Sequence, residues 1–111
     1  MTLRKAQQMD DAVDAFQKAY ALSPGNHRVR SNLASAYASV ERYDEARELL
    51  EKLVDDFPDY VNGWFNLALV EFRCGDEVGA RLALGKAGKI RGLTERQMVR
   101  IERLWEMMDG E

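Results

Sequence analysis

The chain has few of the residues that usually mark a disulfide scaffold, a metal centre or a catalytic site. Its 111 residues include one cysteine, one histidine and two prolines. A single cysteine cannot form an internal disulfide, and the sequence has no cysteine and histidine spacing typical of a metal site. We therefore expect no disulfide framework, no metal and no cofactor.

Long apolar runs are missing as well. No stretch approaches the roughly 20 apolar residues of a membrane span, and the N-terminus has no apolar segment of signal-peptide length. With a formal net charge of −3, the chain is not drawn to nucleic acid or to an anionic membrane. We predict a cytoplasmic protein, and the sequence leaves open whether it is a piece of a longer chain.

What the sequence does have is a repeat, because residues of the same type recur 34 positions apart. The matching pairs are Leu33 and Leu67, Ala34 and Ala68, Ala46 and Ala80, and Leu50 and Leu84. A further shift by 34 positions aligns Ala12 with Ala46, Phe16 with Leu50, and Pro24 with Pro58. One period thus appears three times.

Each period contains two helical patterns separated by a turn. In the second helix of the middle unit, one face carries Ala46, Leu49, Leu50, Leu53, Val54 and Phe57, which is the spacing of an amphipathic α-helix. Turns follow at "SPGN" and "FPDY", where Asn26 and Asp59 are good types of residue to cap the next helix. The sequence therefore predicts stacked helix–turn–helix units.

These residues resemble the tetratricopeptide repeat (TPR) family, whose pattern is Trp-x-x-Leu-Gly-x-x-Tyr followed by Ala, an aromatic or Leu, Ala and Pro. The resemblance covers roughly residues 3 to 92. Its residues are Ala12, Phe16, Ala19 and Pro24 in the first unit, Leu33, Ala34, Tyr37, Ala46, Leu50 and Pro58 in the second, and Trp64, Leu67, Ala68, Gly75, Ala80, Leu84 and Ala87 in the third. It implies an all-α solenoid.

The chain departs from the family pattern at Arg30, Glu71 and Gly92, which stand where Trp, Tyr and Pro are expected. We predict a single TPR domain over residues 1–111. It divides into a partial first repeat (1–26, mainly its second helix), a second repeat (27–60), a third repeat (61–93) and a C-terminal capping helix (94–109). Residues 2–8 are either a remnant of a first helix or an extension of the helix that follows.

The tail after residue 93 breaks the period. Thr94 and Gln97 have the spacing of a capping box, so a new helix is expected to start there. Its apolar stripe would cover the open end of the stack, with a binding or dimerising helix as the alternative. Its basic stripe of Arg96, Arg100 and Arg103 is read as a solvated face, then as a surface for an acidic partner.

Enzymatic chemistry finds no support in the sequence, and we predict that the protein is not an enzyme. His27 has no catalytic partner near it in the pattern, Cys74 has no second cysteine, and no phosphate-binding loop of the type GxxxxGK[ST] occurs.

The TPR resemblance implies a concave groove lined by the first helix of each unit. At the groove positions the second unit has Arg28, Ser31, Asn32, Ser35, Ala38 and Ser39, and the third has Asn62, Phe65, Asn66, Leu69, Phe72 and Arg73. Phe65, Leu69 and Phe72 would place an apolar surface in the groove. Some TPR domains hold a terminal carboxylate with a Lys/Asn/Arg clamp, but Ser31 and Phe65 replace its basic residues here.

Two classes of function remain. The first is a non-catalytic interaction module, scaffold-like or chaperone-like, that binds a peptide or helix of another protein in the groove. The alternative is a structural or self-associating module, such as a homodimer, or a fragment of a longer TPR protein. Neither nucleic acid nor a membrane is an expected partner.

Overall fold

The computed structural model describes the backbone of residues 3–110 and the side chains of residues 8–110. Over that range the chain forms six α-helices and no strands, as the all-α prediction requires. The helices are α1 (Leu3–Leu22), α2 (His27–Ser39), α3 (Tyr43–Asp56), α4 (Val61–Arg73), α5 (Glu77–Gly88) and α6 (Glu95–Asp109). No helix in the described part combines the length and the apolar character that crossing a membrane requires.

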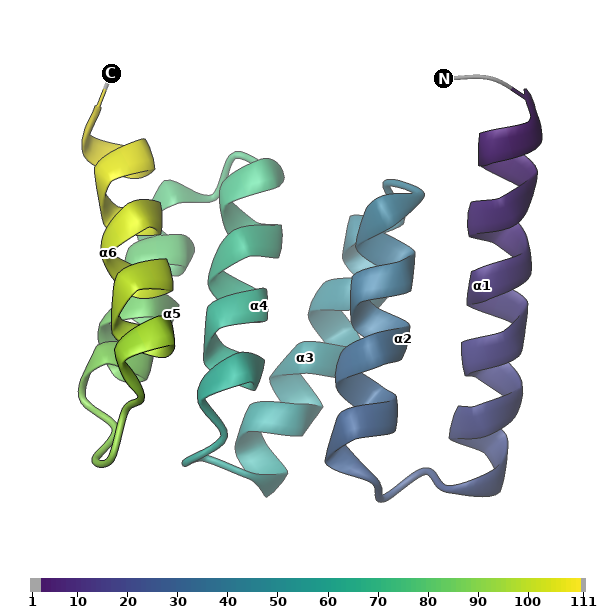
Figure 1. The fold of residues 1–111 in the computed structure, drawn as a ribbon, viewed down its shortest axis with the longest axis horizontal. Coiled ribbons are helices and arrows are strands. Elements are labelled where there is room, and N and C mark those ends of the chain that lie inside the picture. Colours follow the sequence, from purple (N-terminus) through teal and green to yellow (C-terminus); the bar gives the residue numbers. More distant parts are fainter. Residues whose placement is uncertain (1–2, 111) are drawn as a thin grey trace.

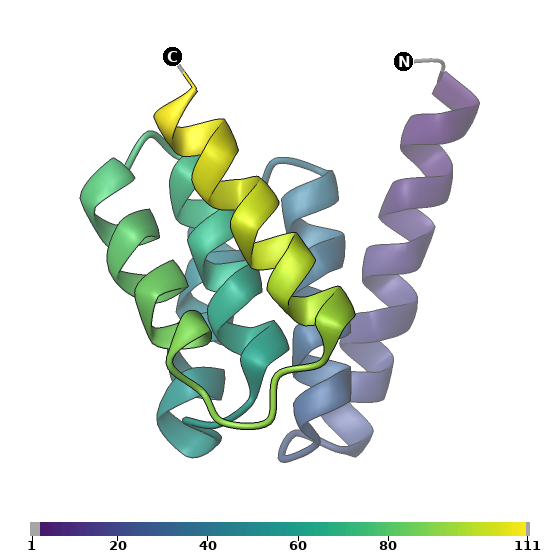
Figure 2. The ribbon, with the colours of Figure 1, turned by 60° about the vertical axis from the view of Figure 1, so that its left-hand side comes forward.

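The helices form an α-solenoid of two layers. α2, α4 and α6 lie in one layer with α3 and α5 behind them, and α1 stands beside α2 at the end opposite α6 (Figure 1). Turned by 60°, the molecule shows α6 crossing in front of α4 (Figure 2). Both α4 and α5 contact α6. Thus α6 closes one end of the stack, and we call the surface of the first layer the α2–α4–α6 face.

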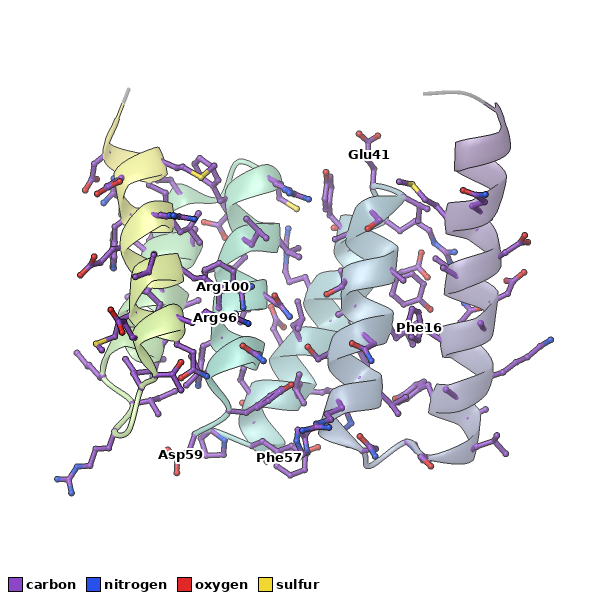
Figure 3. The ribbon with its side chains drawn as sticks, in the orientation of Figure 1. Phe16, Glu41, Phe57, Asp59, Arg96 and Arg100 are labelled. Atoms are coloured by element: carbon purple, nitrogen blue, oxygen red, sulfur yellow. The ribbon has the colours of Figure 1, made fainter. Side chains whose placement is uncertain are left out.

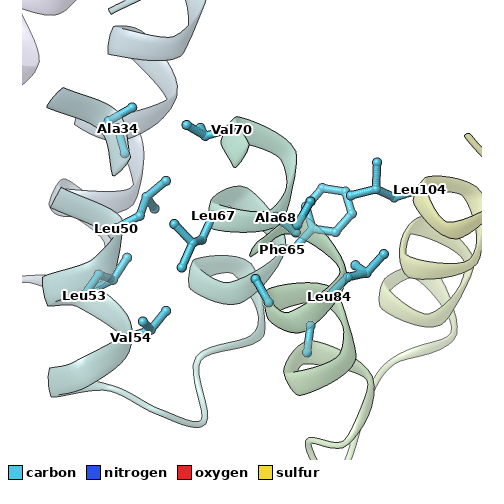
Figure 4. Close-up of a cluster of buried hydrophobic side chains, with 14 of the residues drawn as sticks. Ala34, Leu50, Leu53, Val54, Phe65, Leu67, Ala68, Val70, Leu84 and Leu104 are labelled. Carbon is cyan, nitrogen blue, oxygen red and sulfur yellow. The ribbon is translucent and has the colours of Figure 1, made fainter. Parts of the chain in front are cut away.

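The core lies between the two layers and is built mainly from leucine and alanine (Figure 4). The largest fully buried side chains are Leu33, Leu50, Leu53, Leu84 and Val13. Burying one such leucine contributes about 1.5–3 kcal/mol. The alanines of the 34-residue pattern in the second and third units are fully buried too, and their small side chains let neighbouring helices approach closely; they are Ala34, Ala46, Ala68, Ala80 and Ala87.

The helix starts agree with the sequence at two of three predicted caps. The Asn26 side chain accepts hydrogen bonds from the backbone N–H groups at the start of α2, and Thr94 with Gln97 forms a complete capping box on α6. Asp59 was expected to cap α4, and this was wrong. The turn closes with the Tyr60 amide donating to the Phe57 carbonyl, so α4 starts one residue later, with Tyr60 at the cap.

The N-terminal alternative is resolved over the described residues. α1 is continuous from Leu3 to Leu22, so residues 3–8 extend the helix that follows them. Residue 2 lies outside the described part. In the described part, α1 packs only against α2, whereas α3 packs against both α2 and α4.

Replacing Glu41 by glycine is expected to stabilise the fold by about 1 kcal/mol. Glu41, between α2 and α3, has a positive φ of 63°. Gly75 lies 34 positions later, in the equivalent turn between α4 and α5, and has a φ of 87°. A side chain in this left-handed conformation costs roughly 1–2 kcal/mol, which glycine avoids. Urea denaturation should show the gain. Glu51→Gly, inside α3, is the control and should lose about 1 kcal/mol. Equal losses in both variants would contradict this account.

Candidate functional site

A recess lies between α2 and α4 on the α2–α4–α6 face. It has a volume of about 190 Å³ and is lined by Ala34, Ser35, Ala38, Ser39, Leu50, Asn66, Leu69, Val70 and Arg73. We call it the α2–α4 recess. The structure thus brings together six of the predicted groove residues: Ser35, Ala38, Ser39, Asn66, Leu69 and Arg73.

The recess has an apolar floor and a polar rim. Ala34, Leu50 and Val70 are buried beneath it, and Ser35 and Arg73 are exposed at its edge. Small-molecule sites usually have volumes of about 300–1,000 Å³, so this recess is too small for a typical metabolite. The recess has room for one apolar side chain of a longer bound segment, and the Arg73 guanidinium of the protein lies beside that position.

Ser31, a predicted groove residue, is not available for binding. Its side chain is buried, and the Asn66 side-chain amide donates a hydrogen bond to the Ser31 hydroxyl at 3.0 Å. The prediction that Ser31 is open to a ligand was therefore wrong, because α2 and α4 pack against each other at this level. The Ser31–Asn66 pair ties the two helices together beside the recess.

Phe65 was predicted to present its ring to the groove, and this was wrong too. Only 9% of Phe65 is exposed. It lies next to Leu104 of α6 (Figure 4), and the Arg100 guanidinium carbon sits 4.4 Å from the centre of its ring. α6 therefore covers the Phe65 side chain, which the sequence pattern had placed in an open groove.

The remaining predicted groove residues lie outside the recess. Arg28 and Asn32 are exposed on α2, while Asn62 and Phe72 are half-buried on α4. Leu69, which does line the recess, is half-buried and packs on the core. Of the predicted apolar trio, Leu69 is the member that is open to a ligand inside the recess.

Two arginines of α6 belong to the face, although their sequence pattern was interpreted first as a solvated face and only second as a surface for an acidic partner. Arg96 and Arg100 lie between α6 and α4 (Figure 3), and both are exposed. The signal was present in the sequence, because Arg96 and Arg100 fall 34 positions after Asn62 and Asn66. Extending the repeat register into the C-terminal helix would have placed them on this face.

The described residues include no cluster of potential metal ligands. No group of three histidine, cysteine or acidic side chains is arranged to hold a metal ion in that part of the chain. The His27 ring packs against Phe57 and Tyr60, with ring centres 5.2 and 4.7 Å apart, so it contributes to packing between two turns.

Glu71, which replaces an aromatic residue of the family pattern, is the one buried carboxylate of the described core. It is 8% exposed, and its Oε2 has no hydrogen-bond partner. Burial raises the pKa of Glu71 above its usual value, the nearby Asp76 carboxylate raises that pKa further, and Arg47 opposes both. A methyl group at Gly79 would overlap this carboxylate, so the glycine leaves room for it.

Glu71→Gln is expected to stabilise the fold at neutral pH. Since the pKa of Glu71 is raised in the folded state, the wild type loses stability as the pH rises through that pKa. The variant should be more stable at pH 7, because glutamine carries no charge that has to be buried. The gain should vanish below pH 4.5, the ordinary pKa of a glutamate side chain, because the wild-type carboxyl group is then protonated and uncharged. Urea titrations at several pH values test this, and a gain independent of pH would contradict it.

The comparisons with known proteins point to one family. A family model described as tetratricopeptide repeat matches residues 3–68. The Hsp70-Hsp90 organizing protein of Triticum aestivum is 36% identical over 81 residues, which are 73% of this chain and 14% of that protein. The heat-shock protein cognate co-chaperone sgt12 of Aspergillus fumigatus is 31% identical over 81 residues, which are 73% of this chain and 24% of that protein.

A solved structure gives the same result. The crystal structure of the Sgt2 TPR domain from Aspergillus fumigatus superposes with a TM-score of 0.77 and 25% sequence identity. The match covers 93% of this chain and 70% of that chain. The chain therefore corresponds to most of a TPR domain, and it spans a quarter or less of the length of the two relatives.

Proposed function

Because the chain belongs to the tetratricopeptide repeat family, we propose that it is a non-catalytic interaction module that holds a segment of a partner protein in the α2–α4 recess. The observation that carries this proposal is the recess itself, with its apolar floor and its polar rim, which includes Arg73. An apolar side chain of the segment packs on Leu69. An acidic group beside it pairs with Arg73, and Asn32 and Ser35 offer hydrogen bonds to its backbone.

Several observations support a protein partner over a small molecule. The recess is smaller than a typical metabolite site. The face around it also carries exposed arginines on three helices, namely Arg28, Arg73, Arg96 and Arg100. Cations arranged along a face favour an extended acidic segment. The relatives are named for organising Hsp70 and Hsp90 and as a co-chaperone, which supports a scaffold or chaperone-associated role here.

The recess differs from a Lys/Asn/Arg carboxylate clamp. The two positions that would carry basic residues in that clamp hold Ser31 and Phe65, and both are buried. We therefore propose that an internal apolar and acidic segment, rather than a terminal carboxylate alone, is the ligand.

The proposal is tested by selecting peptides from a displayed random library on the immobilised protein. Selected peptides are then measured against Ser35→Tyr, which fills the recess from an exposed position on α2. We expect the selected peptides to combine an apolar residue with acidic neighbours, and to lose binding to the variant. Failure to select any peptide, or unchanged binding to Ser35→Tyr, would contradict the proposal.

A further inference from the structure

Two similar pockets lie along the edge of the stack where the helix pairs are joined. The first, of about 500 Å³, is lined by residues that include Pro24, Arg30, Lys52, Asp55 and Asp56. The second, of about 540 Å³, is lined by Pro58, Asp59, Trp64, Lys86, Lys89, Ile90 and Arg91. Five lining residues of the first pocket have counterparts 34 positions later in the second: Pro24 and Pro58, Arg30 and Trp64, Lys52 and Lys86, Asp55 and Lys89, and Asp56 and Ile90. We call these two cavities the first and second edge pockets.

The two pockets are built by the same contact. In the first, Arg30 Nε donates a hydrogen bond to the Pro24 carbonyl at 2.7 Å. In the second, Trp64 Nε1 donates to the Pro58 carbonyl at 2.7 Å. The backbone and the hydrogen bond are thus repeated, while the side chains that set the charge are different.

Charge is balanced in the first edge pocket and unbalanced in the second. In the first, two cations face two carboxylates, and Arg30 forms an ion pair with Asp56. In the second, Lys89 and Ile90 replace those carboxylates, so that three cations face the single carboxylate of Asp59. Within the described residues, no carboxylate lies within ion-pair distance of Lys86, Lys89 or Arg91.

The second edge pocket also contains a half-buried aromatic and apolar wall. Trp64 and Ile90 are half-buried there, and the Lys86 ammonium lies 5.3 Å from the centre of the Trp64 ring. Asp59 marks this edge at the bottom of the molecule (Figure 3), and none of the residues that line the pocket lines the α2–α4 recess. At 540 Å³ the pocket is in the size range of ligand sites.

We infer that the second edge pocket is a second binding site, which takes an anionic peptide segment of a partner protein. The three cations bind its carboxylate or phosphate groups, and an adjacent apolar side chain packs on Trp64 and Ile90. Because this site does not share a residue with the α2–α4 recess, it does not depend on the function proposed for the recess.

The fluorescence of Trp64 reports directly on this pocket once Trp105, the other tryptophan, is replaced by phenylalanine. Two probes are titrated into the Trp105→Phe protein: a hexapeptide of glutamates, and an otherwise uncharged peptide carrying three phosphoserines, which has about the same net charge. We expect a saturable change in Trp64 emission with at least one probe. The probe that binds more tightly identifies the anion as a carboxylate or a phosphate.

Variants decide whether the pocket is responsible. Lys89→Asp restores the acidic residue that the first edge pocket has at this position, and should weaken binding at least about tenfold. Arg91→Ala is a second variant with a smaller change. Lys18→Asp, on the exposed surface of α1, makes the same change in net charge away from the pocket and should stay within about twofold.

Three results would overturn the inference. The first is the absence of a saturable change with either probe. The second is equal weakening by Lys89→Asp and Lys18→Asp, which would show that only the net charge matters. The third is full binding by both Lys89→Asp and Arg91→Ala, with circular dichroism showing that both are folded.

Discussion

Leu104→Ala is expected to lower the free energy of unfolding by about 2–5 kcal/mol, the usual cost of removing a buried leucine side chain. Leu104 is 2% exposed on α6 and lies next to the Phe65 ring of α4 (Figure 4). Truncation would leave a cavity at the interface of the two helices and expose the ring. The loss should therefore be as large as for a leucine between two repeats.

Met107→Ala is the matched control for this prediction. Met107 lies on the same helix but is 57% exposed, so its truncation should change stability by less than about 0.5 kcal/mol. Both variants are compared with the wild type by thermal and urea denaturation. A loss below 1 kcal/mol for Leu104→Ala would show that α6 is not an integral part of the core.

Leu69→Asp is expected to weaken binding of a library-selected peptide at least about tenfold, which is 1.4 kcal/mol. The substitution replaces the apolar side chain of the α2–α4 recess by a charge that repels acidic ligands and cannot hold an apolar one. Isothermal calorimetry with one selected peptide gives the affinity. Circular dichroism checks the fold, because Leu69 is half-buried.

Leu82→Asp is the matched control, since it makes the same change at a side chain that is 65% exposed on α5. α5 lies in the other layer of the solenoid, behind α4 and α6 (Figure 1). The affinity of Leu82→Asp should stay within about twofold of the wild type. If both variants lose affinity equally, the peptide does not bind in the recess.

Leu69 is a better site for this substitution than Phe65. Phe65→Ser would remove a buried ring that packs under α6, so a loss of binding could not be separated from a loss of the fold. Leu69 is the apolar residue of the predicted trio that faces a recess.

The sequence was sufficient to predict features that repeat or that depend on neighbouring residues. The alanine and leucine positions recur every 34 residues, so helix pairing could be read from any two units. The capping box of Thr94 and Gln97 is a local signal whose two residues are three positions apart, and it is present in the structure. Both kinds of feature are determined by spacing within one or two helices.

Burial by a distant segment could not be predicted in the same way. Phe65 carries the spacing of a groove residue, and only the position of α6, about 35 residues later in the chain, determines that it is covered. The Ser31–Asn66 hydrogen bond also joins residues of two different repeats. Continuing the repeat register into residues 95–109 would have indicated that α6 takes the place of a further first helix, with Arg100 near this face.

The central claim is that the α2–α4 recess binds a partner segment, and amide chemical-shift mapping tests it most directly. A library-selected peptide is titrated into ¹⁵N-labelled protein, and shifts are followed for every assigned residue. The account predicts the largest shifts at Ser35, Ser39, Asn66, Leu69 and Arg73, with small shifts along the outer surface of α5. Shifts confined to α1 or to the outer surface of α5, with the recess unchanged, would contradict it.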